Sequence, residues 1–238
     1  MMNKKILICM LLLISAVGAM AQNGEEQVGR FSIIPRVGVA IANCSDVSLS
    51  VLGEQTSSEL KSKSQAGFLG GVDFEYRASK LLAVSLGAYY ARQGFRFADC
   101  ELVQDVDKGL YTGIKNPHAN LDYVNVPLML KAYLAPGFAV MAGAQMGFLC
   151  TRGKMHYEST ELEKDKNGST TYKETNSYKA KIPTKNTDVS IPVGLSYEYM
   201  NVILDARYNI GLTKVNKDVA GDSKNKVLTF TVGYRFTL

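Results

Sequence analysis

The feature that most constrains this chain is an alternation of apolar with polar or small residues, repeated in eight segments. Turn-forming or polar stretches separate the segments, and no long segment has the period of an amphipathic helix. A period of two indicates a β-strand whose two faces meet different surroundings. The sequence therefore predicts eight strands, at residues 33–42, 66–77, 81–97, 121–134, 138–149, 188–199, 202–212 and 227–238.

The two faces of these strands differ in charge. In the segment 202–212, Leu204, Tyr208 and Ile210 share one face, while Asp205 and Arg207 share the other. In a soluble sandwich or a lipocalin the charged face would point to water, whereas in a membrane barrel it would point to the interior. The period alone is compatible with both arrangements.

The connections favour the membrane barrel. Three of them are short, at 78–80, 135–137 and 200–201, and four are long and polar, at 43–65, 98–120, 150–187 and 213–226. Short turns on one side and long loops on the other are typical of outer-membrane barrels. We therefore expect an all-β fold, an eight-stranded antiparallel transmembrane β-barrel with short periplasmic turns and long extracellular loops.

The N-terminal residues predict export. Lys4 and Lys5 precede an apolar stretch at 6–17, and the small residues Ala19 and Ala21 stand where signal peptidase requires them. We expect a signal peptide at 1–21 cleaved after Ala21, a short periplasmic segment at 22–31 and the barrel domain at 32–238. The expected location is the bacterial outer membrane.

Composition excludes several other classes of protein. Hydrophobic residues make up 46% of the 238-residue chain and charged residues 21%, which rules out wholesale disorder. The net charge of +5 falls to +3 without Lys4 and Lys5, which is too small and too scattered for a nucleic-acid surface. Only the N-terminus has a long apolar run, so a polytopic helical membrane protein is also excluded.

The last strand ends in bulky apolar residues at alternate positions: Phe230, Tyr234, Phe236 and the terminal Leu238. This pattern resembles the C-terminal signal that barrel-insertion machinery reads, although Leu stands where a terminal Phe is commonest. The expected partners are therefore outer-membrane lipids and, during biogenesis, the insertion machinery. We expect a monomer.

The chain resembles the PorT-like family of outer-membrane β-barrel domains. The family pattern is an aromatic residue, an acid two positions later, Pro-Leu and a Lys, then a turn and Gly-x-Gln-x-Gly. Here it reads Tyr-Val-Asn-Val-Pro-Leu-Met-Leu-Lys-Ala-Tyr at 123–133, Gly137-Phe138, and Gly-Ala-Gln-Met-Gly-Phe-Leu at 143–149. Asn125 replaces the usual acid. The resemblance covers 30–238 and implies the fold and the location; a role as an accessory component of an envelope or secretion complex rests on it alone.

Motif residues also make local predictions. Pro127 and Pro192 lack a backbone N–H, so we expect a local distortion of the barrel at each. Gly143 and Gly147 are expected to leave room in a lumen that, with eight strands, holds only side chains.

The inward face is expected to hold a charge network of five positive and four negative side chains. Charges shielded from water need partners, so we expect them to pair with one another. A structural plug of ion pairs is the favoured interpretation, and a proton or ion path is the alternative. The nine residues are Arg36, Asp73, Glu75, Arg77, Lys131, Glu198, Asp205, Arg207 and Arg235.

No catalytic, cofactor-binding or metal-binding residues are predicted. A barrel hydrolase would need a nucleophile beside a His. The two His, His118 and His156, fall in the long connections without an adjacent Ser. We expect a non-enzymatic protein with a structural or surface-interaction role; the alternatives are a lipocalin-like soluble carrier of a small lipophilic ligand and, third, an outer-membrane barrel hydrolase.

The long connection 151–187 is the expected contact point for an envelope protein partner. Residues 160–164 and 171–175 alternate around Asp165-Lys166-Asn167-Gly168, which predicts a β-hairpin. We expect strands 138–149 and 188–199 to continue beyond the membrane as this polar ribbon.

Three cysteines remain after the leader: Cys44, Cys100 and Cys150. All three are expected on the long-loop side. A disulfide between Cys44 and Cys100, or between Cys100 and Cys150, is left open, because it would require Cα atoms within about 7 Å of each other.

Overall fold

The computed structural model describes residues 28–238 except 45–47, 53–56, 106–107, 152–153, 165–169, 182–183 and 215–222. The predicted signal peptide at 1–21 lies outside the described residues, and so does most of the segment 22–31. No helix in the described ranges is long and apolar enough to cross a bilayer.

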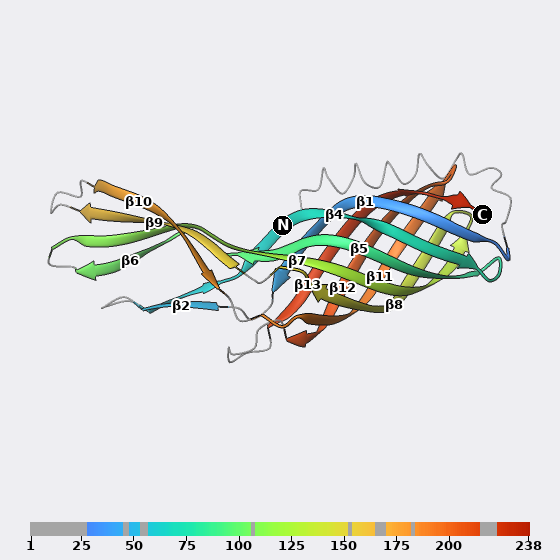
Figure 1. The fold of residues 1–238 in the computed structure, drawn as a ribbon, viewed down its shortest axis with the longest axis horizontal. Coiled ribbons are helices and arrows are strands. Elements are labelled where there is room, and N and C mark those ends of the chain that lie inside the picture. Colours follow the sequence, from blue (N-terminus) through green and yellow to red (C-terminus); the bar gives the residue numbers. More distant parts are fainter. Residues whose placement is uncertain are drawn as a thin grey trace.

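Eight strands close into a barrel (Figure 1). Each strand pairs with two neighbours, and the last strand pairs with the first, so the ring has no open edge. The all-β antiparallel fold predicted from the alternation is confirmed. The strands are β1 (Phe31–Cys44), β4 (Lys63–Arg77), β5 (Leu82–Arg96), β7 (Leu110–Ala135), β8 (Phe138–Leu149), β11 (Thr187–Tyr199), β12 (Val202–Lys214) and β13 (Lys224–Tyr234).

The barrel turns its apolar side chains outward. Arg36 on β1 is 2% exposed, whereas the next residue, Val37, is 53% exposed. The same alternation continues along the other barrel strands, with Leu128 and Leu204 outside and Lys131 and Asp205 inside. An apolar exterior and a charged interior are the reverse of a lipocalin, so the soluble-carrier alternative is not favoured.

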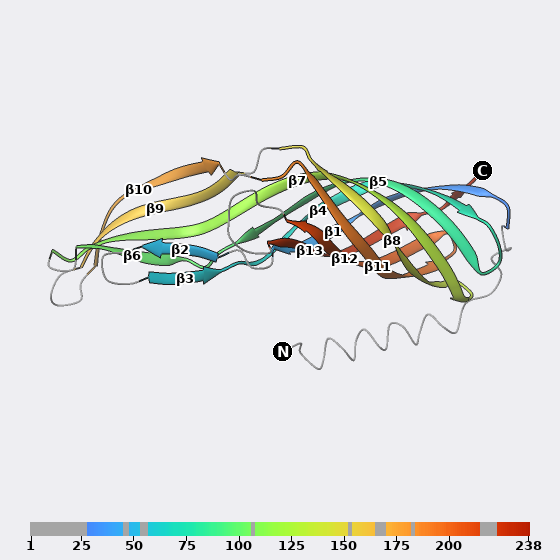
Figure 2. The same cartoon turned by 90° about the horizontal axis from the view of Figure 1, so that it is seen from below.

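The short turns gather at one end of the barrel. Gly137, Met200 and Asn201 have positive φ angles, which let the chain reverse within two or three residues. Short β14 (Phe236–Thr237) pairs with β1 at the same end, and the N–H of Leu238 donates to the carbonyl of Phe31 at 2.9 Å. The C-terminus therefore lies beside the short turns (Figure 2).

The expected distortions at Pro127 and Pro192 take a mild form. Pairing of β5 with β7 is interrupted opposite Pro127, and pairing of β8 with β11 is interrupted at Pro192. The register is the same on both sides of each gap. Each proline therefore removes ladder contacts without inserting a bulge.

The long connections contain strands that the sequence did not predict. β2 (Ser48–Leu52) pairs with β3 (Ser57–Lys61), and β6 (Cys100–Asp105) pairs with β7. The predicted hairpin is present as β9 (Lys154–Lys164) and β10 (Thr170–Lys181), although its turn falls outside the described residues. The connections 43–65 and 98–120, which were expected as loops, therefore contain strands of their own, whereas the hairpin predicted within 150–187 is confirmed.

The hairpin is attached differently from the prediction. β8 ends at Leu149 and β11 begins at Thr187, and neither continues into it. Instead β7, a single strand of 26 residues, leaves the barrel and pairs with β9. We call β6, residues 110–118 of β7, β9 and β10 the ribbon, a four-stranded sheet that projects from the end opposite the short turns (Figures 1 and 2).

A bulge bends β7 at the base of the ribbon. Its register with β9 shifts between Lys115 and His118, and Asn116 has φ 48°. Pro117 follows and offers no N–H to the ladder, while its carbonyl accepts from the N–H of Phe97 at 2.8 Å. The extra residue bends and twists the sheet where it leaves the barrel.

Candidate functional site

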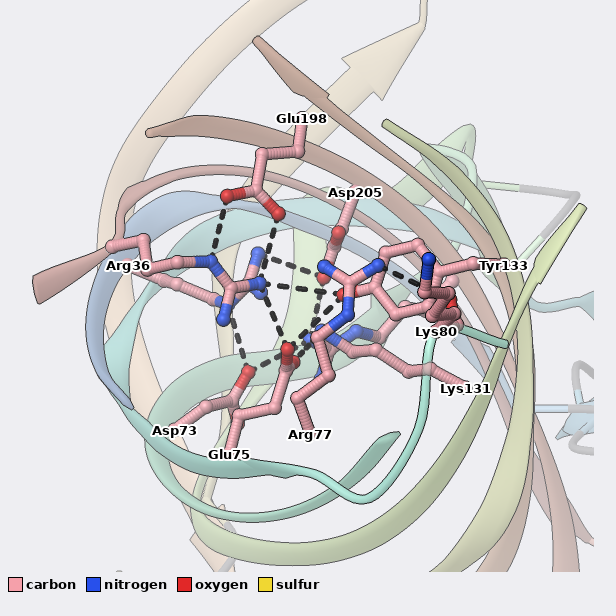
Figure 3. A network of polar contacts seen from close by, with 11 residues as sticks. Arg36, Asp73, Glu75, Arg77, Lys80, Lys131, Tyr133, Glu198 and Asp205 are labelled. Carbon is pink, nitrogen blue, oxygen red and sulfur yellow. Dashed lines mark hydrogen bonds and ion pairs between the residues drawn. The ribbon is translucent and has the colours of Figure 1, made fainter. Parts of the chain in front are cut away.

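The structure places all nine charged residues proposed for the interior inside the barrel. Eight of them come from five strands, β1, β4, β7, β11 and β12, and Arg235 lies between β13 and β14; the side chains point toward one another near the short-turn end (Figure 3). Eight of the nine take part in ion pairs, and these pairs form two separate groups of four residues. Alternation brings them together, because every second residue of each strand faces the same narrow lumen.

The first group joins two arginines to two aspartates. Arg36 contacts the carboxylates of Asp73 and Asp205, each at 2.8 Å. Arg207 contacts the same two carboxylates at 3.1 and 2.6 Å. The side chains of Arg36, Asp73 and Asp205 are fully buried. Each carboxylate is therefore shared between two guanidinium groups, which offsets the cost of removing these charges from water.

The second group centres on Glu75. Its carboxylate accepts from Lys131, from Arg235 at 2.8 Å and from the hydroxyl of Tyr133 at 3.1 Å. Arg235 also makes a two-pronged contact with Glu198, at 2.6 and 2.9 Å. The planar guanidinium suits this double contact, because its donors lie in a fixed fork.

Arg77 is the ninth charge and has a different role. Its guanidinium carbon lies 3.9 Å from the centre of the Tyr133 ring, and its Nη2 donates to the carbonyl of Lys80 at 3.3 Å. A guanidinium over an aromatic ring is stabilised by the negative face of that ring. The remaining eight charges, four of each sign, balance one another.

The lumen beyond this network is nearly full. A cavity of about 20 Å³ lies against Tyr89, Asn125, Gln145, Arg207 and Asn209. That volume accommodates roughly one water molecule. The described lumen at this level is therefore packed with side chains.

A second polar cluster lies farther toward the ribbon. Asp188 accepts from Thr213 at 2.6 Å and from Asn225 at 3.4 Å, and Asn225 also donates to Gln93 at 3.1 Å. Sequence reasoning omitted Asp188 and Asn225 from the interior set. The signal was present for Asp188, since it stands in phase with Glu198 on the same predicted strand.

The mouth of the barrel at the ribbon end is apolar inside. Phe95, Phe97, Leu121, Tyr123 and Cys44 form one buried cluster. The two phenylalanine rings meet edge to face with centroids 5.6 Å apart. The apolar cluster therefore lines the side of the mouth that β1, β5 and β7 form.

The two histidines come together at the base of the ribbon. His118 and His156 are register partners on β7 and β9, and their rings stack with centroids 5.4 Å apart. Nδ1 of His118 lies 2.8 Å from the carbonyl oxygen of Asn116. Partial burial and the nearby positive charges of His118, Lys179 and Lys154 lower the pKa of His156 from its usual value of 6.5. Within the described ranges, no three His, Cys, Asp or Glu side chains form a group suited to a metal ion.

The three cysteines differ in their exposure to solvent. Cys44 is buried in the apolar mouth, Cys100 is half-buried on the ribbon, and Cys150 is exposed after β8. No disulfide joins these three described residues. Burial and the negative charge of Asp99 raise the pKa of the Cys100 thiol.

The glycines of the motif allow close packing. A Cβ at Gly143 would lie 2.0 Å from the carbonyl oxygen of Leu128, and one at Gly147 would lie 2.8 Å from Oδ1 of Asn125. Gly143 therefore has no room for a larger residue, whereas a larger residue at Gly147 would require the Asn125 side chain to move.

A closed ring of eight strands, apolar outside and charged inside, defines a transmembrane β-barrel. Residues 20–217 match the family model of the outer membrane protein beta-barrel domain, and the chain belongs to that family. The protein is thus an outer-membrane β-barrel, as the alternation and the connections predicted. The match does not extend to the narrower PorT-like resemblance, which stays a prediction.

Solved structures of small outer-membrane barrels are similar to this chain. Neisserial surface protein A (NspA) is 17% identical, with a TM-score of 0.43, and the match covers 87% of this chain and 97% of that one. Ail of Yersinia pestis is 16% identical (TM-score 0.41; 88% and 100%), and OprG of Pseudomonas aeruginosa is 14% identical (TM-score 0.39; 90% and 99%). No curated protein matches the sequence.

Proposed function

We propose that this protein is a non-enzymatic, non-conducting barrel that holds its ribbon outside the cell as a contact surface. The observation that carries the proposal is the continuity of β7, a strand that starts in the ribbon at Leu110 and ends at the short turns at Ala135. One unbroken strand couples the membrane anchor to the projecting sheet. The barrel then anchors the ribbon in the membrane, and the ribbon binds the partner.

The interior supports a plug rather than a path. Carboxylates and cations face each other at 2.6 to 3.1 Å in the first group, and the neighbouring cavity holds about one water. An ion would have to break several buried pairs to pass, and separating buried pairs is costly. A proton or ion path is the second candidate for these same residues.

The ribbon has the features of a contact surface. Tyr172 on β10 is 65% exposed, and the ring of Tyr178 stacks on Tyr157 with centroids 5.6 Å apart. Exposed aromatic residues are enriched where proteins bind one another. Among the described strands, none pairs with the outer edge of β10, so that edge offers backbone groups to an added strand.

The first test of the proposal is conductance in planar bilayers. The folded protein is expected to give no discrete channel steps, and reproducible channels of uniform size would support the path instead. A matched variant opens the network and serves as the positive control, because it shows that the assay can detect a current through this barrel. In it, Ala replaces Arg36, Asp73, Asp205 and Arg207.

The second test places a photo-crosslinker in living cells. We expect a discrete protein adduct from position Tyr172 or Tyr178, and none from the lipid-facing Leu134. A role as an accessory component of an envelope or secretion complex predicts that the adduct contains another envelope protein. Equal labelling from all three positions would contradict a specific contact through the ribbon.

A further inference from the structure

The outward face of the sheet carries a row of basic side chains where the ribbon begins. Strand register places them side by side: Lys63 on β4 pairs with Arg96 on β5, and Arg96 pairs with His118 on β7. His118 pairs with His156 on β9, which in turn pairs with Lys179 on β10. Directly paired residues point to the same side of a sheet, so five adjacent strands present one continuous basic row.

This row faces away from the lumen. Arg96 is in phase with the outward residues of β5, and His118 is in phase with the outward residues of β7. Lys63, Arg96 and Lys179 are exposed, and the two histidines are half-buried. One step closer to the barrel, Lys154 pairs with Asn120 and extends the basic surface.

The basic row lacks acidic partners within the described part of the chain. None of Lys63, Arg96, Lys154 and Lys179 is in an ion pair there. The acidic side chains nearest along these strands are Asp122, which is paired with Arg92 at 2.9 Å, and Glu158, which is a register partner of Lys115. Like charges placed directly opposite are destabilising, so a bound anion would relieve the repulsion in the row.

The distance of the row above the apolar band of the barrel indicates which kind of anion could reach it. On β5 the apolar band ends at Tyr90, six residues before Arg96; on β7 it ends at Val124, six residues after His118. With about 3.3 Å per residue and a tilt near 40°, the row lies about 15 Å above the last apolar residues. The headgroup layer of a simple phospholipid is only about 5–8 Å deep. Phosphorylated sugars of a glycolipid reach this height, whereas phospholipid phosphates do not.

We propose that the basic row, with Lys154, binds the phosphate groups of the outer-leaflet glycolipid. Lipopolysaccharide carries phosphates on the inner-core sugars that stand above its lipid A, and its acyl chains would lie against the apolar band below. Lys and Arg near a membrane surface each strengthen the attraction of anionic lipid about fivefold. This contact would fix the ribbon relative to the membrane, and it is independent of any protein partner.

The test measures glycolipid binding to the folded full-length protein in zwitterionic micelles by native mass spectrometry. The probe is lipopolysaccharide with a phosphorylated inner core, compared with the same glycolipid after dephosphorylation, with phosphatidylglycerol and with inorganic phosphate. We expect retained binding only of the phosphorylated glycolipid, weakening at high salt.

The decisive variant combines Arg96→Gln, Lys154→Gln and Lys179→Gln. Its affinity is expected to fall about a hundredfold, at roughly fivefold per side chain. The control variant, Arg30→Gln with Lys80→Gln and Lys108→Gln, removes the same charge elsewhere and should bind as the wild type does. A heat-dependent shift in gel mobility checks that each variant is folded. If the triple variant does not fold, the single variants Lys154→Gln and Lys179→Gln test the same prediction, each with an expected loss of affinity of roughly fivefold.

Three results would overturn the proposal. The first is unchanged affinity of the triple variant, and the second is equal binding of the dephosphorylated glycolipid. The third is equal binding of phosphatidylglycerol or inorganic phosphate, which would replace the glycolipid with a general anion.

Discussion

Among the described residues, charged side chains are buried and paired in the barrel interior, but exposed and without ion-pair partners in the basic row at the base of the ribbon. Inside the barrel, Arg36, Asp73 and Asp205 are fully buried and each contacts an opposite charge. At the base of the ribbon, Arg96 and Lys179 are exposed and stand in a row of basic side chains. The two regions are built from the same kind of alternating strand. Closure of the sheet forces side chains to share a dry lumen, and buried charges there need partners.

The largest expected effect comes from breaking a pair inside the barrel. Asp205→Asn leaves Arg36 and Arg207 with one carboxylate, Asp73, between them. Removal of one partner from a buried ion pair costs about 3–5 kcal/mol, and we expect that loss in the free energy of unfolding. Urea unfolding in lipid vesicles measures it.

A double variant sharpens this prediction. Asp205→Asn combined with Arg207→Met removes a charge of each sign, so part of the lost stability should return. Equal stability of Asp205→Asn and the wild type would mean that the network does not hold the barrel together.

Added volume should have a smaller effect that again separates the two regions. Gly143→Ala in the barrel forces a methyl group against the carbonyl of Leu128, and we expect a loss of about 1–3 kcal/mol. In the ribbon, a Cβ at Gly113 would meet the flexible end of Leu162 at 3.2 Å. Gly113→Ala is therefore expected to leave the unfolding midpoint of the barrel unchanged; a larger effect than that of Gly143→Ala would contradict the comparison.

An ion pair outside the lumen should matter less. The side chain of Arg92 is 51% exposed, and it contacts Asp122 at 2.9 Å. The Asp122 side chain is only 11% exposed, but a pair whose cation is open to water contributes about 0–1 kcal/mol, because water screens it. Asp122→Asn is thus expected to shift the unfolding midpoint only slightly, by less than Asp205→Asn in the same assay. Equal losses would remove burial as the explanation.

The smallest effect is a dependence of the ribbon on pH. The pKa of His156 is below 6.5, because partial burial and the charges of His118, Lys179 and Lys154 disfavour its protonation. The unfolded segment then binds more protons than the paired one, so pairing of β9 weakens as the pH falls below about 6.5.

Hydrogen exchange can follow this change strand by strand. Amides of β9 and β10 should exchange faster as the pH falls through this range, after correction for intrinsic rates, while those of β12 stay protected. His156→Gln should abolish the difference, and its persistence in that variant would assign the effect to other groups.

Much of the barrel could be predicted from the sequence. Alternation along 138–149 matches β8 residue for residue, and the short turns at 135–137 and 200–201 fall where the structure has them. A period of two arises when the two faces of a strand meet different surroundings. In the barrel strands, one face meets lipid and the other meets the packed interior. The inward position of Asp73 or Arg235 follows from that phase alone.

For the ribbon, the sequence predicted the hairpin of β9 and β10 but not the way in which it is attached. Its strands carry polar side chains on both faces, so their pattern does not say which strand pairs with which. β9 pairs with β7, which lies more than thirty residues earlier in the chain, because β7 extends past the end of β8 and leaves an edge open there. The basic row is also invisible in the sequence, since Lys63, Arg96 and Lys179 meet only through the register of five strands.

The most direct test of the account is the environment of adjacent residues on β7. Spin labels at Leu128 and Met129, each placed as a single cysteine on a background without Cys44, Cys100 and Cys150, can be probed with oxygen and with a water-soluble nickel chelate. We expect strong contact with lipid-dissolved oxygen at 128, little contact with either agent at 129, and contact with the chelate at a label placed at Tyr172. Oxygen contact at 129 with exposure of 128 to the chelate would contradict it, because the apolar face would then be the interior.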